Sequence, residues 1–254
     1  MDYDPQDQNH IVDRLALLAK RENYDKIVVK VPDDSCDFFL VKGYKIEGKV
    51  PLYYQGKKDC YFLSQFLSSE RSATTKENDY NNIIQIAKQK KKTPLHPLDE
   101  DYHLEIMDPS KAEEMVHLYK NTFKTYPFPI FDPLYIRETM GSNVVYFGIY
   151  YHGELVALAS SEMNIKQKNA EMTDFAIQRE HRGKQLAKHL LTTMEQEMLK
   201  RDIKTLYTIA RAESLPMNCT FAGLGYDFGG TLLNNTQISG NIESMNIWYK
   251  GLSS

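Results

Sequence analysis

The chain has 254 residues, of which 42% are hydrophobic and 26% are charged, a balance typical of a soluble globular protein. Its formal net charge of -3 argues against a dedicated nucleic-acid binder, because binding to a phosphate backbone needs a marked basic excess. No run approaches the ~18 apolar residues that span a bilayer, and the polar start is unlike a signal peptide, so no membrane partner is expected.

The cysteine and histidine patterns predict neither a disulfide framework nor a metal site. Cys36, Cys60 and Cys219 are odd in number and lack CxxC spacing, which indicates buried thiols in a reducing cytoplasm. The histidines are scattered without HxxxH or HExxH spacing, so no metal is expected. We therefore expect a cytoplasmic protein.

The first part of the chain predicts a small α+β region. Its expected elements are a helix over residues 11–18 and strands over 26–31, 50–54 and 60–63. Residues 76–92 are helix-prone and end in KQKKK, after which TPLHPLDED carries two prolines. A lysine run beside prolines is typical of a solvated linker, so we place the domain boundary there, between regions 1–95 and 96–254.

The second region shows a regular order of elements. Its expected strands cover residues 103–107, 144–151, 154–163, 170–177, 205–210, 231–237 and 244–249. Helices are expected after the cap Asp108-Pro109-Ser110, over 135–140, from Leu186 onward and over 215–223. The order β-α-α-β-β-β-α-β-α-β-β predicts an α/β fold.

The most informative stretch is EMTDFAIQREHRGKQLA, residues 171–187. It predicts a strand, a basic turn and the start of a long helix, where free backbone N–H groups attract anions. Gly183 lets the backbone approach a phosphate closely, and Arg182, Lys184 and Lys188 add positive charge. The stretch therefore predicts a pyrophosphate site, with a basic surface connection as the alternative.

This loop resembles the acetyl-CoA signature of the GNAT N-acetyltransferases, Gln/Arg-x-x-Gly-x-Gly/Ala after a strand that ends in an aliphatic residue. Arg182 and Ala187 fit, and Ile177 is the aliphatic residue, whereas Gln185 stands where the middle glycine is expected. The order of elements over 96–254 also matches the GNAT fold, a mixed, mostly antiparallel sheet flanked by helices. The resemblance implies acetyl-CoA as acetyl donor, in contact with Phe175, Ile177, Arg182, Gly183, Lys184, Gln185, Leu186, Ala187, Asn218 and Phe221. Asn218 has a helix cap as its alternative role.

Part of the sequence pattern of this fold recurs in the N-terminal region. Phe39-x-x-x-Gly43-Tyr44 follows the strand KIVVKV, as Phe221-x-x-x-Gly225-Tyr226 follows TLYTIA. The region is therefore expected to be a partial, half-GNAT-like copy of the C-terminal half, with coincidence as the alternative.

Acetylation of an amine requires a base. A free ε-amine has a pKa near ~10.4, so only about one molecule in 2,500 is neutral at pH 7. Glu171 has the spacing to Ile177 that a catalytic glutamate often has in GNAT enzymes, and we favour it as the base. Strand alternation puts Glu171, Thr173, Phe175 and Ile177 on one face and Asp174 on the other, where Asp174 is expected to hold a substrate ammonium. A structural role for either carboxylate stays open.

The usual proton donor to the departing thiolate is a tyrosine, and Phe221 stands at that position. Either another donor serves, or coenzyme A leaves as a thiolate, which a thiol pKa near ~8.5 permits.

The family with the strongest resemblance is that of the β-lysine N-acetyltransferases, through AEMTDFAI, TIARAESLPMNCTFAGLGY and LNNTQISGNIESMNIWYK. It implies acetylation of the ε-amine of β-lysine to give a compatible solute. Arg211 is the expected carboxylate partner, and further acceptor contacts are expected from Asp174, Tyr126, Phe128, Asn235 and Glu243. The sequence leaves open whether the acceptor is another small diamine and whether the protein is instead a non-catalytic acyl-CoA-binding module. It also leaves open whether the protein forms a homodimer.

Overall fold

The computed structural model describes residues 7–90, 95–238 and 240–252. Its strands are β1 (Lys26–Pro32), β2 (Lys45–Tyr54), β3 (Lys58–Phe66), β4 (Tyr102–Ile106), β5 (Val144–Tyr151), β6 (Glu154–Asn164), β7 (Asn169–Ile177), β8 (Thr205–Arg211), β9 (Asp227–Ile238) and β10 (Asn241–Gly251). Its α-helices are α1 (Gln8–Arg21), α2 (Cys36–Leu40), α3 (Ser69–Ser72), α4 (Glu77–Lys88), α5 (Ala112–Thr122), α6 (Pro133–Met140), α7 (Leu186–Lys200) and α8 (Leu215–Gly223). Short 3-10 turns are η2 (Asp33–Ser35), η3 (Pro109–Lys111) and η4 (Arg179–His181).

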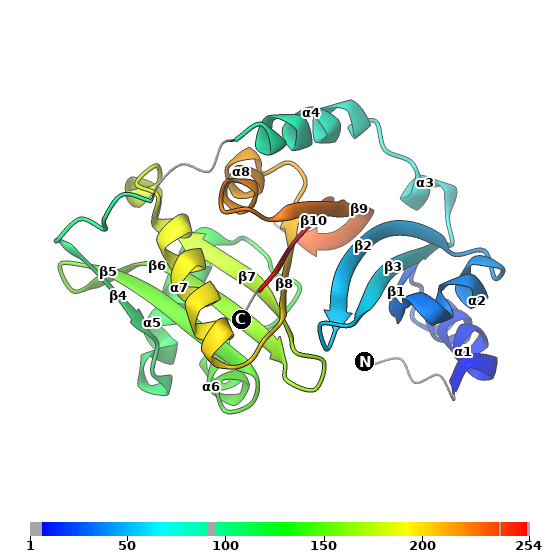
Figure 1. Ribbon diagram of the computed structural model, residues 1–254, viewed down its shortest axis with the longest axis horizontal. Helices are drawn as coiled ribbons and strands as arrows, with labels where there is room; N and C mark the ends of the chain where they lie inside the picture. Colours follow the sequence, from blue (N-terminus) through cyan, green and yellow to red (C-terminus); the bar gives the residue numbers. More distant parts are fainter. Residues whose placement is uncertain (1–6, 91–94, 239, 253–254) are drawn as a thin grey trace.

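All ten strands belong to one sheet in the order β1-β3-β2-β9-β10-β8-β7-β6-β5-β4 (Figure 1). Neighbouring strands are antiparallel except for β7 and β8, which are parallel. This confirms the predicted α/β class with a mostly antiparallel sheet. The expected boundary falls on the connection after α4, of which residues 91–94 lie outside the described residues.

Helices cover both faces of the C-terminal half of the sheet. Helix α7 packs on one face, and α5 and α6 pack on the other (Figure 1). The inward side chains of α7 are buried: Leu186, Ala187, Leu190, Leu191, Met194 and Met198. They share a core with Phe147, Ala170 and Met172 of the strands, because the apolar i, i+4 stripe of the helix faces the sheet.

Strand β2 begins earlier than its apolar pattern predicts. Residues 45–49, KIEGK, look polar, yet Glu47 is buried because it pairs with Lys26 of β1 at 2.7 Å. Both side chains are less than a tenth exposed. Hydrophobic alternation does not predict a strand whose buried positions carry charged residues.

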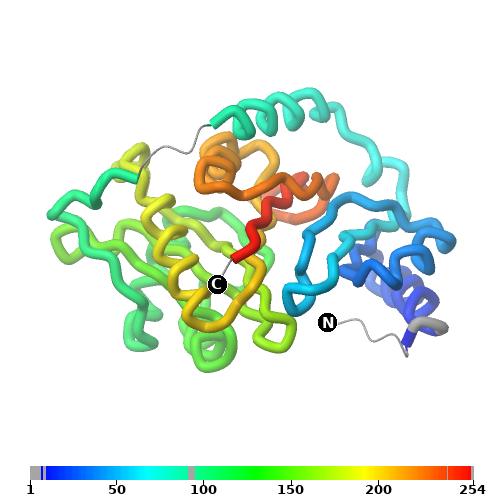
Figure 2. The backbone as a smooth tube through the Cα atoms, viewed as in Figure 1, coloured from blue at the N-terminus to red at the C-terminus, as the bar shows by residue number. Residues whose placement is uncertain are grey.

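Two adjacent three-stranded units of the sheet repeat one arrangement. Strands β1, β3 and β2 pair in the same antiparallel order as β8, β10 and β9, each with a helix after its first strand. The two units join where β2 pairs with β9. Figure 2 shows the blue and the orange-to-red segments side by side. Helix α4 then crosses from the N-terminal unit to pack on α8.

The helix ends of these units share their turn geometry. Gly43 and Gly225 both have a left-handed φ, of 87° and 85°, which glycine adopts without steric cost. The flanking rings make the same edge-on contact, Phe39 with Tyr44 at 5.3 Å and Phe221 with Tyr226 at 5.1 Å between centroids. These matches favour the interpretation of the N-terminal region as a partial copy.

The two units meet at glycines. Gly48 of β2 pairs with Gly230 of β9, whose φ is 142°. A Cβ atom at Gly230 would overlap with the Glu47 carbonyl oxygen and lie 2.5 Å from the Gly48 Cα. Backbone thus approaches backbone here without room for a side chain.

We expect Gly230→Ala to lower the free energy of unfolding by ~1–3 kcal/mol, because the neighbouring backbone must move. Urea unfolding measures this change. Gly251→Ala on β10 is the matched control, since its Cβ would have nothing within 4 Å. Equal stability of both variants would contradict the close junction.

Candidate functional site

Strands β7 and β8 separate near the middle of the sheet. They pair only from Asn169 and Thr205 to Glu171 and Tyr207, and these two described strands share no pairs beyond this point. A cavity of about 620 Å³ lies between the separated segments. The edge of β7 that faces β8 is therefore open to a ligand over its last residues.

The cavity is lined from five directions. The lining includes Thr173, Asp174, Phe175 and Ile177 of β7, and residues 208–211 of β8. The loop before α7 and the start of α7 contribute His181, Arg182, Gly183, Gln185, Leu186, Ala187 and Lys188. Ser214, Pro216, Met217, Thr220 and Phe221 close one side, and Thr122, Phe123, Tyr126, Ile238 and Met245 close the other.

A bulge in β7 changes which side chains share a face. Leu158 pairs with Ala176 and Ser160 with Thr173, so β7 has one residue more than β6 in this step. Asp174 takes a left-handed φ of 58° at the bulge. The expected alternation is therefore wrong beyond Thr173: Phe175 and Ile177 face the α7 side, opposite to Glu171.

Asp174 faces the same side as Glu171, contrary to the prediction. Its carboxylate accepts hydrogen bonds of 2.5 Å from both Tyr126 Oη and Ser160 Oγ, and one of 3.3 Å from Thr173. Burial raises the pKa of Asp174, while these hydroxyl groups lower it. The carboxylate is thus fixed at the bulge, on the cavity wall.

Glu171 lies two residues before Thr173 on the strand and is not one of the cavity-lining residues. Its side chain is partly exposed, on the face that carries Tyr207. Burial raises the pKa of Glu171 to about 7, with Lys30 and a hydrogen bond from Tyr207 acting against this rise. A carboxylate with this pKa is suited to accept a proton at neutral pH.

The loop before α7 forms the predicted cradle. Gly183 has a φ of 81°, and Arg182 donates a 3.3 Å hydrogen bond from Nε to the Ile177 carbonyl oxygen. Gln185, at the helix start, has a left-handed φ of 61°, which explains why the family motif has glycine there. Its Oε1 atom is buried without a hydrogen-bond partner in the described structure, as a group awaiting a ligand would be.

Two residues expected at the cofactor are engaged elsewhere. The Lys184 amine donates to Tyr102 Oη at 2.7 Å and lies over the Tyr102 and Tyr151 rings, outside the cavity lining. Asn218 is buried and donates to two backbone carbonyl oxygens, while its Oδ1 accepts from Asn246 and Trp248. A saturated amide cannot also bind a ligand, and Asn218 is not a helix cap either, because it lies inside α8, whose N-cap is Ser214.

On the α7 side of the cavity, Phe175 and Phe221 make an edge-on ring contact at 5.7 Å. Phe221 is 1% exposed and has no polar atom on its side chain. The position expected for a proton donor therefore carries only an apolar wall.

Arg211 has a partner that its sequence position did not predict. Its Nε and Nη2 atoms donate to both carboxylate oxygens of Glu243, at 2.6 and 2.5 Å. Glu243 is buried, whereas Arg211 lines the cavity. The two residues thus act as one neutral pair, and the Nη1 group of Arg211 is not part of it.

Two acceptor-side expectations are corrected. Phe128 is 56% exposed and does not line the cavity, unlike Tyr126 of the same loop. Asn235 binds Lys26 at 3.2 Å and Thr236 at 3.1 Å, in the junction with the N-terminal unit. Both lie outside the cavity because β9 turns toward β2 and the loop turns toward solvent.

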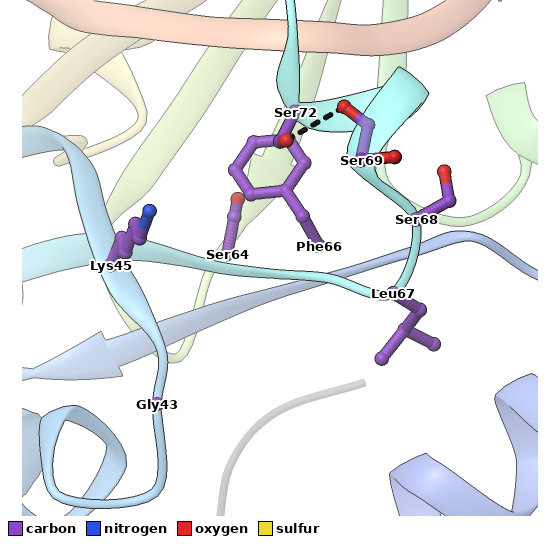
Figure 3. A pocket seen from close by; sticks show the side chains of 8 residues that line it. All are labelled: Gly43, Lys45, Ser64, Phe66, Leu67, Ser68, Ser69 and Ser72. Carbon is purple, nitrogen blue, oxygen red and sulfur yellow. Dashed lines mark hydrogen bonds between the residues drawn. The ribbon is translucent and has the colours of Figure 1, made fainter.

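A second hollow of about 280 Å³ lies in the N-terminal unit (Figure 3). It is lined by Gly43, Lys45, Ser64, Phe66, Leu67, Ser68, Ser69 and Ser72. Three of its four serine hydroxyl groups are engaged within the protein: Ser72 donates to the Ser69 carbonyl oxygen, Ser64 to Glu47, and Ser68 accepts from Arg71 N–H. Among the described residues, no carboxylate or imidazole lines this hollow, so these lining residues lack the groups for acid–base chemistry.

Three further expectations concern metal ions, membrane-spanning helices and the cysteines of the described part of the chain. Within it, no three His, Cys, Asp or Glu side chains are grouped to hold a metal ion, and no helix is long and apolar enough to cross a bilayer. Cys36 and Cys60 are buried as predicted, whereas Cys219 is only half-buried.

Sequence reasoning missed several residues of this region. Ser160 and Thr173 bind Asp174, and His181 lines the cavity beside Arg182. A serine pair inside the apolar run ELVALASSEM was a signal for the first of these. No sequence pattern indicated a role for Lys30, because its neighbours on the sheet come from distant segments of the chain.

The model of the acetyltransferase (GNAT) family matches residues 112–226. The chain is 39% identical to a β-lysine N(6)-acetyltransferase of Methanococcus maripaludis, over 96% of this chain and 89% of that protein. The chain belongs to the GNAT acetyltransferase family. A β-lysine N(6)-acetyltransferase of Methanosarcina mazei is 35% identical, over 95% of this chain and 97% of its own length. The N-acetyltransferase YodP of Bacillus subtilis is 33% identical, over 94% and 86%.

Solved acetyltransferase structures share their fold with 60% of this chain. The ribosomal-protein-S18-alanine N-acetyltransferase of Escherichia coli has a TM-score of 0.52 at 16% identity, over 60% of this chain and 95% of that chain. The spermidine N-acetyltransferase SpeG of Vibrio cholerae has a TM-score of 0.51 at 16% identity, over the same shares. This GNAT chain is an acetyl-CoA-dependent N-acetyltransferase.

Proposed function

We propose that the protein transfers the acetyl group of acetyl-CoA to the ε-amine of β-lysine in the cytoplasm, and that the product is a compatible solute. The relatives in Methanococcus maripaludis and Methanosarcina mazei carry β-lysine acetylation in their names and align over nearly their full length. The observation that carries the proposal is the cavity itself. An anion cradle and the fixed carboxylate of Asp174 meet there, at the separation of β7 and β8.

The residues of the cradle fit the pyrophosphate of acetyl-CoA. Gly183 leaves space above the loop, since nothing lies within 4 Å of a Cβ placed there. The first N–H groups of α7 and the cation of Arg182 supply the positive field that a phosphate requires. The unpaired edge of β7 at Phe175 and Ile177 offers backbone groups for the pantetheine arm.

Acetyl-CoA supplies the thioester that the amine attacks, and Glu171 is the proposed base. The ε-ammonium first loses a proton and becomes a neutral nucleophile, and the nitrogen loses a second proton to solvent as the C–N bond forms and the C–S bond breaks. Glu171 takes the first proton through a water molecule, because Glu171 lies two residues, or about 7 Å between Cα atoms, before the cavity-lining Thr173. Phe221 offers no proton, so coenzyme A leaves as a thiolate.

Asp174 is the proposed site for the substrate ammonium. Three hydroxyl groups hold its carboxylate in one orientation, so it binds a cation without first losing conformational entropy. Tyr126 both donates to Asp174 and lines the cavity, which gives the aliphatic part of the acceptor a wall.

The pair of Arg211 and Glu243 is proposed to bind the other end of β-lysine. The Nη1 group of Arg211 is suited to the acceptor carboxylate, and Glu243 holds the guanidinium plane in place. A diamine without a carboxylate would leave Nη1 without this partner.

Arg211→Lys should therefore weaken β-lysine binding by ~1–3 kcal/mol, or about 5- to 150-fold in KM, because lysine keeps the charge and loses the planar fork. Turnover of cadaverine, a poor substrate of the native protein, should change little. Steady-state kinetics with both acceptors measure the difference.

The matched control is Arg137→Lys, which alters an arginine paired with Glu113 on the protein surface. It should leave both acceptors unaffected. Efficient native turnover of cadaverine with β-lysine inert would overturn the acceptor assignment and leave acetyl transfer intact.

A further inference from the structure

A lysine of the N-terminal unit reaches the reaction side of the GNAT sheet. Lys30, on β1, donates from Nζ to Tyr207 Oη at 3.4 Å, and its amine lies 5.5 Å from the centre of the Tyr207 ring. Tyr207 belongs to β8, next to Glu171 of β7. The contact therefore joins two distant strands of one long sheet.

This contact requires a strongly curled sheet. Five steps separate β1 from β8 in the strand order, which a flat sheet would spread over about 24 Å at ~4.8 Å each. Instead, Tyr53 and Phe62 of the N-terminal strands share a buried core with Tyr207, Met245 and Ile247. The N-terminal unit folds over the same face of β7 and β8 on which Glu171 lies.

Tyr207 links the lysine to the carboxylate. Its hydroxyl group accepts a hydrogen bond from Lys30, and Tyr207 lies directly opposite Glu171 in the register of β7 and β8. Tyr53 Oη lies 3.4 Å from the same hydroxyl group and fixes it from the side of β2. Tyr207 and Tyr53 are both buried, whereas Lys30 itself is exposed on β1.

Charged and titratable groups face Glu171 from five strands. Besides Lys30 of β1 and the two tyrosines of β2 and β8, these are Glu162 of β6 and Asp174 of β7. Burial raises the pKa of Glu171 most, Glu162 and Asp174 raise it further, and Lys30 is the cation that lowers it. Removal of Lys30 would leave Glu171 beside two further carboxylates, Glu162 and Asp174, without this positive charge.

We propose that Lys30 is a positioning residue for acetyl transfer, which acts through Tyr207 to hold the Glu171 carboxylate oriented and ionised. This inference rests on the proposed function, in which Glu171 is the base. It makes the N-terminal unit part of the catalytic apparatus of the adjoining GNAT domain. Without Lys30, a larger share of the base is protonated at neutral pH, so less of it accepts a proton from the substrate.

The test is the pH dependence of kcat/KM for β-lysine. In the native protein the profile should break where Glu171 titrates, near pH 7. Lys30→Met should move this break up by about one pH unit, as loss of a neighbouring opposite charge does. Turnover should fall several-fold at about pH 6.5 and return by about pH 9. Lys30→Arg keeps the charge and should keep the native profile.

The control is Lys49→Met on β2, since Lys49 is also paired with an acid, Asp59 at 2.7 Å, and also lies over a tyrosine ring. It should leave the break in place. A break that stays fixed in Lys30→Met, or moves equally in Lys49→Met, overturns the inference.

Glu171→Gln separates this inference from the proposed function on which it rests. A large loss of turnover in Glu171→Gln supports the base, and Lys30→Met should then cause no further shift of the profile in that background. Full activity of Glu171→Gln would overturn the base assignment itself. A large loss in Glu171→Gln with an unmoved break in Lys30→Met would remove only the role of Lys30.

Discussion

Glu171→Gln should lower kcat ~10²–10⁴-fold at neutral pH while acetyl-CoA affinity stays near the native value. Glutamine keeps the size of the side chain and removes its basicity. Part of the loss should return as the pH rises, because more of the acceptor amine is then neutral without help. Steady-state kinetics across about pH 6 to 10, with calorimetry of acetyl-CoA binding, measure both effects.

The matched variant is Asp174→Asn, because both carboxylates lie on the same face of β7. It should raise KM for the amine more than it lowers kcat, since Asp174 is proposed to bind the ammonium. A larger loss of kcat in Asp174→Asn than in Glu171→Gln would transfer the base role to Asp174.

Glu171 should also make stability depend on pH. Its pKa is about 7 in the folded protein, against a usual value of 4.5. Between these values the folded state binds more protons than the unfolded state, so the free energy of unfolding falls as the pH rises through this window. Glu171→Gln should remove this part of the decline, which urea unfolding at about pH 5 and pH 8 would show.

Gly183→Asp should weaken acetyl-CoA binding on the order of 10²-fold. A carboxylate at ~5 Å from a phosphate charge costs about 3 kcal/mol at an effective dielectric constant of ~20. The positive φ of Gly183 is tolerated by aspartate better than by most residues, so the folded loop should persist. Isothermal calorimetry measures the affinity.

Gly183→Asn separates charge from bulk, because asparagine has the same shape and also tolerates a positive φ. It should lose far less affinity than Gly183→Asp. Equal losses would assign the effect to bulk, and native affinity in a folded Gly183→Asp would contradict the cradle.

The fold of the C-terminal half was accessible from the sequence because its elements have clear periods. Continuous apolar runs predict β5 and β6, which are buried on both faces, and the i, i+4 stripe predicts α7, whose inward side is buried. The cradle was also accessible, since Gly183 and Arg182 lie within one continuous motif. Local signals of this kind need no knowledge of distant contacts.

The acceptor side was less accessible because its geometry is non-local. The bulge at Asp174 depends on pairing with β6 and reverses the faces of the following residues. The pairing of Arg211 with Glu243 joins strands that are 32 positions apart in the chain. Lys30 reaches Tyr207 over 177 positions, through the curl of the sheet. Alternation within one strand contains none of this information.

The most direct test of the account is one incubation of the native protein with acetyl-CoA and equal amounts of β-lysine, α-lysine and cadaverine. Mass spectrometry with fragmentation identifies the acetylated nitrogen, and a thiol assay counts released coenzyme A. We predict singly acetylated β-lysine as the main product, modified on its ε-nitrogen, with one thiol released per product. Acetylation of cadaverine or α-lysine in preference to β-lysine, or on the β-nitrogen, would contradict the account.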